Sequence, residues 1–103
     1  MTQKKLKTFA EKLNAFMRMR ESSAVYIERD YAHRFEYLPQ AEVHDLFVLC
    51  NRIEATACEL AEQVQRGAMD RETFRSQLAK RHPELQAERV ARLISRSLYR
   101  TWA

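Results

Sequence analysis

Hydrophobic side chains recur every three or four residues along most of the chain, a spacing that places them on one face of an α-helix. The first such stretch predicts a helix over about residues 3 to 20. The lysines and arginines of this stretch lie mostly off the apolar face, so the predicted helix is amphipathic and basic. Its apolar positions are Leu6, Phe9, Ala10, Leu13, Phe16 and Met17.

A second helical segment is predicted over residues 24 to 38, where four apolar residues again share one face. Ser22 and Ser23 precede it and suit an N-cap or a break. Pro39 marks its end, because the residue before a proline disfavours the α region, whereas proline itself suits the first turn of the next helix. Partly extended structure is the alternative, since the segment opens with residues of β preference. Its shared apolar positions are Ile27, Tyr31, Phe35 and Leu38.

The longest periodic stretch predicts a third helix of about 25 residues that closes at Arg66 and Gly67. Gly67 is the only glycine of the chain, and it stands where a left-handed residue commonly ends a helix. We expect this third helix to be central to the fold. Its apolar positions are Val43, Leu46, Phe47, Cys50, Ile53, Ala57, Leu60, Ala61 and Val64.

Two shorter helices are predicted to complete the chain. Asp70 suits an N-cap for a fourth helix that runs to about His82, and Pro83 interrupts the pattern. A fifth helix begins near residue 84 or 86 and continues almost to the end, with Val90, Ile94, Leu98 and Trp102 on one face. The sequence therefore predicts an all-α fold: a single helical domain over residues 1–103, a compact bundle of about five helices with a long central third helix and a C-terminal helical hairpin.

Length and composition set limits on the class of protein. The chain has 103 residues, of which 46% are hydrophobic and 31% charged, values typical of a soluble globular domain. No apolar run approaches the roughly 20 residues that a membrane-spanning helix needs, and no signal peptide is evident. We therefore expect a cytoplasmic protein without a membrane partner. A homodimer is also expected, because one small core leaves apolar stripes to be covered.

The sequence offers no support for catalysis, a metal site or a cofactor. Cys50 and Cys58 lie eight residues apart in one predicted helix, so their Cα atoms are roughly 12 Å apart, too far for a disulfide. The three histidines lack the spacing of metal ligands, and one glycine is too few for a phosphate-binding loop. A non-enzymatic protein is predicted.

Charge is unevenly distributed along the chain. Residues 1–20 carry a net charge of +5, residues 21–65 of −6 and residues 66–103 of +5. Such blocks indicate basic surfaces that either face a polyanion or fold back onto the acidic middle of the chain.

Four arginines of the predicted fifth helix form the clearest candidate site. They fall within about 80° of one another on a helical wheel, roughly opposite the apolar face. Guanidinium groups in such a row suit successive phosphates, and four phosphate contacts imply a slope of about −4 for binding against log salt. The alternative is a solvated face whose arginines pair with Glu84, Glu88 or the acidic third helix. The candidate nucleic-acid-binding residues are Lys80, Arg81, Arg89, Arg92, Arg96 and Arg100.

Residues 73–94 resemble a helix-turn-helix in outline. Leu78 and Ala79 occupy the first helix, a break follows, and Val90 and Ile94 pack the second, which implies that the second helix presents its arginines to a duplex. Pro83 stands where that motif usually has a glycine. A plain helical hairpin fits the same residues.

An aromatic cluster in the second segment supports a different role. Tyr26, His33 and Tyr37 fall near a second face of that segment and are candidate partner-binding residues. Two functions are therefore expected from the sequence. The first is a small regulatory or accessory protein that engages nucleic acid through the basic C-terminal helix; the alternative is an adaptor, inhibitor or chaperone that docks on an acidic protein.

Overall fold

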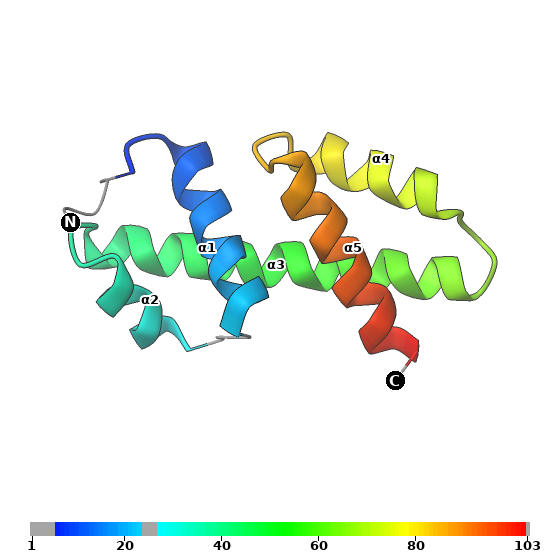
Figure 1. Cartoon of the computed structure of the whole chain (residues 1–103), viewed down its shortest axis with the longest axis horizontal. Coiled ribbons are helices and arrows are strands. Elements are labelled where there is room, and N and C mark those ends of the chain that lie inside the picture. The colour runs from blue at the N-terminus through cyan, green and yellow to red at the C-terminus, as the bar shows by residue number, and fades with distance from the viewer. Residues whose placement is uncertain (1–5, 24–26, 103) are drawn as a thin grey trace. The chain divides into compact units, whose positions relative to one another are not determined.

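Five helices follow one another along the residues that the structure describes (Figure 1). A computed structural model describes residues 6–23 and 27–102, with the backbone alone for Ser22, Ser23 and Trp102, and no strand occurs in these ranges. This confirms the predicted all-α fold of about five helices with a long third helix. The helices are α1 (Phe9–Ser23), α2 (Glu28–Arg34), α3 (Gln40–Gln65), α4 (Arg71–Arg81) and α5 (Ala87–Trp102). None of them is long and apolar enough to cross a membrane.

Helix α1 begins at Phe9, later than the predicted start near residue 3, because a capping box precedes it. Thr8 Oγ1 accepts a hydrogen bond from the Glu11 amide at 3.1 Å, and Glu11 Oε1 accepts one from the Thr8 amide at 3.2 Å. These side chains satisfy amides that the first turn of a helix leaves without partners. At its other end α1 includes Ser22 and Ser23, so these serines close α1 instead of capping the next helix.

Helix α2 is shorter than the segment predicted over residues 24 to 38. Ile27 precedes it in an extended conformation, and the chain leaves the helix at Phe35, where φ is −119° and ψ is 53°. The extended alternative rested on Val25, Tyr26 and Ile27, of which Ile27 is extended, whereas Val25 and Tyr26 lie outside the described residues. The Pro39 carbonyl accepts a hydrogen bond from the Val43 amide at 3.1 Å, so α3 starts directly after the proline, as predicted.

The end of α3 is set by Gly67, as the sequence predicted. Its φ of 76° lies in the left-handed region, which glycine enters without steric cost. The Gly67 amide donates to the Val64 carbonyl at 3.1 Å and the Ala68 amide to the Gln63 carbonyl at 2.9 Å. These two bonds form a Schellman motif, which satisfies carbonyl groups at the helix end.

Asp70 is the predicted N-cap of α4 and takes that role in the structure. Its carboxylate accepts a hydrogen bond from the Thr73 amide at 2.7 Å. This bond favours the ionised form and lowers the pKa of Asp70 below its ordinary value.

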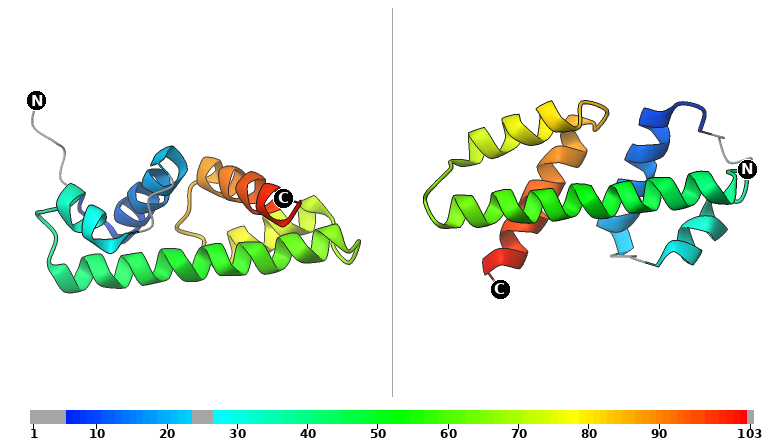
Figure 2. Two further views of the ribbon diagram at one scale, coloured as in Figure 1. Left: turned by 90° about the horizontal axis from the view of Figure 1, so that it is seen from below. Right: turned by 180° about the vertical axis from the view of Figure 1, so that it is seen from behind.

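The helices pack as two compact units, Met1–Cys50 and Asn51–Ala103, and each unit includes one half of α3. In the first unit α1 and α2 pack against the first half of α3 (Figure 2). The Phe16 ring stacks on Phe35 with centroids 4.7 Å apart. The buried apolar residues of this unit are Leu13, Phe16, Met17, Tyr31, Phe35, Leu38, Val43, Leu46 and Cys50. The single-domain organisation stays a prediction.

Arg20 is a charged residue inside the first unit, with 1% of its surface exposed. Its Nε donates a hydrogen bond to the Tyr31 hydroxyl at 3.1 Å, and its Nη2 donates to the Phe47 carbonyl at 3.4 Å. The guanidinium carbon also lies 5.0 Å from the centroid of the Phe47 ring. Polar partners and aromatic faces therefore surround this buried cation.

In the second unit α4 and α5 form the predicted C-terminal hairpin, and α5 crosses the second half of α3 (Figures 1 and 2). Val90, Ile94 and Leu98 are buried, which confirms three of the four apolar positions predicted for the fifth helix; the Trp102 side chain lies outside the described part of the chain. Cys58 is half-buried, and both it and the buried Cys50 are free thiols, in agreement with the sequence prediction. The buried apolar residues of this unit are Ile53, Ala57, Leu60, Ala61, Phe74, Leu78, Leu85, Val90, Leu93, Ile94 and Leu98.

Candidate nucleic-acid interface

The four arginines of α5 occupy different environments. On the helical wheel Leu93 and Ser97 lie between the predicted apolar face and the arginines, and both are fully buried. The buried face is therefore wider than the four predicted apolar positions, and it includes Arg89, whose exposed fraction is 3%. Arg89 does not reach the surface that the sequence assigned to it.

Arg96 and Arg100 share one carboxylate of α3. Arg96 Nη1 donates to Glu54 Oε1 at 2.6 Å, and Arg100 Nη1 lies 3.5 Å from the same oxygen. The Glu54 side chain is 8% exposed, and a carboxylate buried to that extent requires such partners. These two ion pairs join α5 to α3. They match the alternative considered from the sequence, in which the arginines pair with the acidic third helix.

Arg92 is the most exposed arginine of the four, with 62% of its side chain accessible. Its Nη2 lies 3.7 Å from Glu88 Oε1, one turn earlier on the same helix, and Arg89 Nη2 lies 3.1 Å from that oxygen. An exposed pair of this kind contributes at most about 1 kcal/mol, so a phosphate can compete for Arg92.

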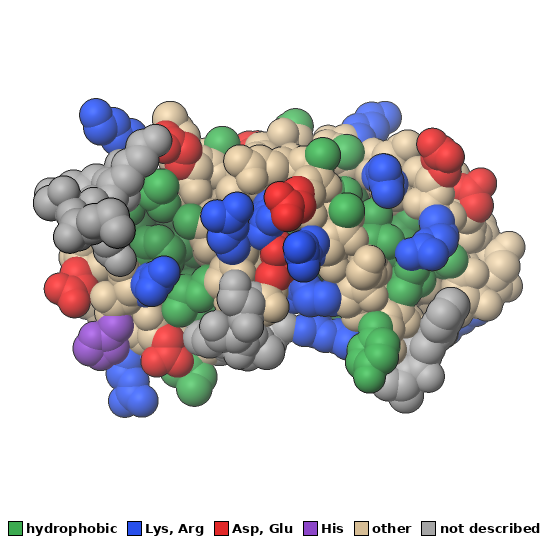
Figure 3. Space-filling model, in the orientation of Figure 1, with side chains coloured by type: hydrophobic (Ala, Val, Ile, Leu, Met, Phe, Trp, Pro, Cys, Tyr) green, Lys and Arg blue, Asp and Glu red, His purple; other side chains and the backbone are tan. Residues whose placement is uncertain are grey.

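Lys80 and Arg81 lie at the end of α4 and are exposed. Neither forms an ion pair with a carboxylate in the part of the chain that the structure describes. The end of α4 lies beside the beginning of α5 in both views of the hairpin (Figures 1 and 2). Over α4 and α5, the face seen in Figure 3 shows basic side chains next to acidic and hydrophobic ones, so the basic surface is interrupted.

The sequence prediction missed two further exposed cations, Arg71 and Arg75, which lie in the first half of α4. Their signal is the composition of that helix, with four basic residues against one acidic residue. Only Phe74 and Leu78 of α4 are buried, so its charged residues remain at the surface.

Tyr99 is the most exposed of the large hydrophobic residues described, at 76%. It follows Arg92 by two helical turns and Arg96 by one, and Arg100 is its neighbour in the chain. The exposed strip of α5 therefore combines an aromatic ring with guanidinium groups.

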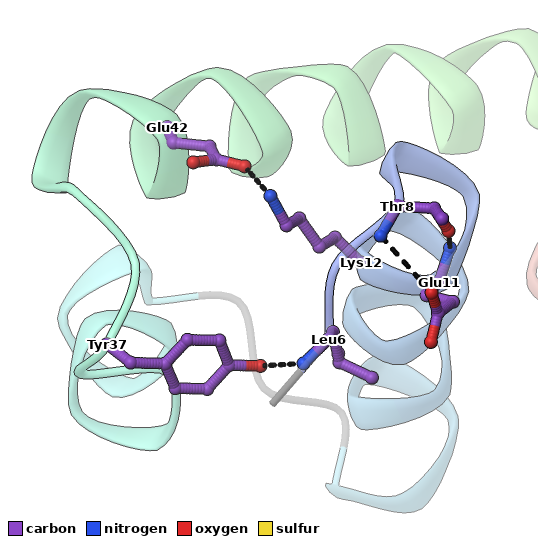
Figure 4. A network of polar contacts seen from close by, with 6 residues as sticks. All are labelled: Leu6, Thr8, Glu11, Lys12, Tyr37 and Glu42. Atoms are coloured by element: carbon purple, nitrogen blue, oxygen red, sulfur yellow. Dashed lines mark hydrogen bonds and ion pairs between the residues drawn. The ribbon is translucent and has the colours of Figure 1, made fainter. Parts of the chain in front are cut away.

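The structure describes two of the three predicted partner-binding residues, and only one of these two is exposed. Tyr26 lies outside the described residues, and His33 is exposed on α2. The Tyr37 side chain is half-buried, and its hydroxyl accepts a hydrogen bond from the Leu6 amide at 3.0 Å (Figure 4). Tyr37 thus holds the segment that leads into α1.

Internal contacts between acidic and basic side chains also occur in the first unit. Lys12 of α1 contacts Glu42 of α3 (Figure 4), and His44 Nδ1 lies 2.7 Å from Glu28 Oε1. Part of the acidic middle segment therefore pairs with the chain's own basic groups.

The connection between the two helices in residues 73–94 differs in length from that of a helix-turn-helix. Residues 82–86 link α4 to α5, a longer connection than the three or four residues of that motif. The helical hairpin, which the sequence left as the alternative, describes this region.

Within residues 6–23 and 27–102, no group of three histidine, cysteine or carboxylate side chains is arranged to hold a metal ion. Burial lowers the pKa of His82, with the Arg81 charge acting in the same direction and Glu84 opposing it. Comparisons with protein-family models, with curated proteins and with solved structures found no match to this chain.

Proposed function

We propose that this chain is a non-enzymatic regulatory or accessory protein that binds nucleic acid through exposed basic side chains of the α4–α5 hairpin. The observation that carries the proposal is the exposure of Lys80 and Arg81 beside the helix that bears Arg92, with no carboxylate partner for either among the described residues. Cations in this state are available to phosphate groups, which supply most of the affinity in non-specific binding.

The arginines of α5 have different roles in this proposal. Arg92 contacts a phosphate directly, since its contact with Glu88 is exposed and weak. Arg100 has 42% of its side chain exposed and contributes at the edge of the surface. Arg96 joins α5 to α3 through Glu54 and Arg89 is buried, so neither contacts a phosphate while these arrangements persist.

The test is fluorescence anisotropy with labelled oligonucleotides of mixed sequence at 50 and 200 mM salt. Three phosphate contacts to a duplex give a slope of about −2.7 against log salt, which lowers the affinity roughly 40-fold over this range. The triple variant Lys80→Glu, Arg81→Glu, Arg92→Glu should lose at least tenfold in affinity at low salt while keeping its melting temperature.

A matched control is the pair Arg29→Glu and Arg34→Glu, which lie exposed on α2 in the first unit. This variant lowers the net charge by four units, against six in the triple variant, but leaves the hairpin intact, so its affinity should fall by less than about threefold. Equal losses in the two variants would mean that overall charge, and not this surface, governs binding. The absence of any salt-dependent binding would reject the proposal.

An acidic protein partner is the second candidate, and one observation favours it. Arg96 and Arg100 already bind the Glu54 carboxylate, so the basic face of α5 accepts the group that an acidic protein would present. Capture of partners from cell extract with and without nuclease separates the two functions. A partner that survives digestion supports protein recognition. The homodimer and the cytoplasmic location stay predictions. Sedimentation equilibrium measures the oligomeric state.

A further inference from the structure

We infer that the preferred ligand of the α4–α5 hairpin is single-stranded nucleic acid, with an unpaired base stacked on the ring of Tyr99. This inference rests on the proposed function and adds the form of nucleic acid. Its starting point is the 76% exposure of Tyr99, a large aromatic side chain on a helix whose other face is buried.

The charges around Tyr99 favour an anionic ligand with a planar group. On a helical wheel Tyr99 lies within about 20° of Arg92, and the two residues are separated by roughly 10 Å along the helix axis. Arg96 lies between them and to one side, and Arg100 follows directly. A strand that lays a phosphate on Arg92 therefore runs along α5 towards the ring of Tyr99.

Stacking separates single strands from duplexes. Every base has an aromatic face that can stack on tyrosine, but in a duplex these faces are covered by neighbouring base pairs. Tyr99 therefore adds nothing to duplex binding except at a helix end. An acidic protein segment would be attracted by the same arginines, but it offers no base to stack on the ring.

The Tyr99 hydroxyl forms no hydrogen bond and its ring no aromatic contact within the described part of the chain. A substitution at this exposed position should therefore leave the fold unchanged, and any loss of affinity can be assigned to the missing ring.

The experiment measures anisotropy of a labelled twelve-nucleotide polydeoxythymidine and of a labelled twelve-base-pair duplex, with unlabelled polyglutamate as competitor. The single strand should bind at least fivefold more tightly than the duplex. Tyr99→Ala should lower the single-strand affinity about tenfold and change the duplex affinity less than twofold. Tyr99→Phe, which keeps an aromatic face, should stay within threefold of the unchanged protein.

Salt dependence gives a second readout that a merely structural residue would not produce. Stacking releases no counterions, so Tyr99→Ala should lower the affinity without changing the slope against log salt. Arg92→Glu should lower the affinity and also reduce the slope, by about 0.7 for a lost contact to a single strand. Phe9→Ala is the matched control, because Phe9 is an exposed aromatic residue of α1, with 49% of its surface accessible. Phe9→Ala should change neither the affinity for the single strand nor the slope against log salt.

The outcomes distinguish the two proposals. Equal affinity for single strand and duplex, or an unchanged single-strand affinity in Tyr99→Ala, would overturn the stacking inference and leave the proposed function standing. Failure of both oligonucleotides to bind would remove the proposed function as well. Polyglutamate that displaces the single strand as effectively as unlabelled polydeoxythymidine would overturn the inference in favour of an acidic protein ligand.

Discussion

The two units of this protein bury arginine side chains in different ways. In the first unit Arg20 is enclosed by the Tyr31 hydroxyl, the Phe47 carbonyl and two aromatic rings. In the second unit Arg96 is held by the Glu54 carboxylate, and 21% of its side chain remains exposed. The first arrangement places a cation inside a core, whereas the second places it at the border between core and surface.

This difference separates structural arginines from arginines that can meet a ligand. A guanidinium surrounded by rings and hydrogen-bond acceptors has no route to solvent, so Arg20 contributes to stability alone. A guanidinium paired with a carboxylate at the border can exchange that carboxylate for another anion, provided that the ligand offers comparable contacts. The number of arginines in a sequence therefore says little about the number available to a partner.

The largest effect expected from this comparison is at Arg20. Arg20→Ala should lower the free energy of unfolding by about 3 kcal/mol, because it leaves a cavity and removes a donor from the Tyr31 hydroxyl and the Phe47 carbonyl. Chemical denaturation followed by circular dichroism measures the change. Arg29→Ala, an exposed arginine on α2, should change stability by less than about 0.5 kcal/mol. A loss at Arg20 no larger than this control would contradict the structural role.

A smaller effect on stability is expected at the Glu54 carboxylate. Glu54→Gln should cost about 1 to 2 kcal/mol, a modest loss because both paired arginines remain partly exposed to water. The same change releases Arg96 and Arg100 from their carboxylate and should raise the affinity for polydeoxythymidine several-fold. Glu62→Gln on α3 makes the same change of charge at an exposed position and serves as the control. Equal affinity in the two variants would show that the released arginines do not reach the ligand.

The smallest effect concerns the caps that begin α1 and α4. The first unit uses the Thr8–Glu11 capping box, whereas the second uses the Asp70 carboxylate, whose pKa is lowered by its bond to the Thr73 amide. A lowered pKa in the folded state gives stability that is fully present above the unfolded value, near pH 4, and is lost as the pH falls through the folded pKa.

Asp70→Asn keeps a side-chain acceptor but removes the titrating group. Its melting temperature should therefore fall less than that of the unchanged protein between about pH 5 and pH 2. Thermal unfolding followed by circular dichroism at several pH values gives the comparison, with Asp45→Asn as a control of equal charge. Parallel pH profiles of melting temperature for the unchanged protein and Asp70→Asn would show that the Asp70 carboxylate does not contribute to the pH dependence of stability.

Much of the fold follows from local signals in the sequence. Gly67, Asp70 and Pro39 marked helix boundaries because each acts through its own backbone or a bond to a near neighbour. The late start of α1 was missed because the periodic apolar pattern extends back to Leu6, ahead of the Thr8 cap. The spacing of apolar residues alone does not define where a helix begins when an apolar residue lies just before the N-cap.

The candidate site was less predictable, because burial and pairing depend on contacts between distant segments. The helical wheel placed Arg89 with the other arginines of α5. It did not show that the buried face of α5 extends over Leu93 and Ser97 and so takes in Arg89. The pairing of Arg96 with Glu54 joins residues 42 positions apart, and the sequence offered Glu84, Glu88 and the whole acidic helix as alternatives. Tyr99 was overlooked because its exposure becomes evident only when the buried face of α5 is known.

The enclosure of Arg20 and Arg89 limits which basic residues are interchangeable during evolution. Arginine keeps its proton at every physiological pH, whereas a lysine in the same surroundings would readily become neutral. At position 20 a lysine would also offer no planar group to the Tyr31 and Phe47 rings. Lysine should therefore be a poor replacement at both buried positions, even though net charge at neutral pH would look unchanged. At the exposed end of α4, where Lys80 and Arg81 already stand side by side, either residue type should serve.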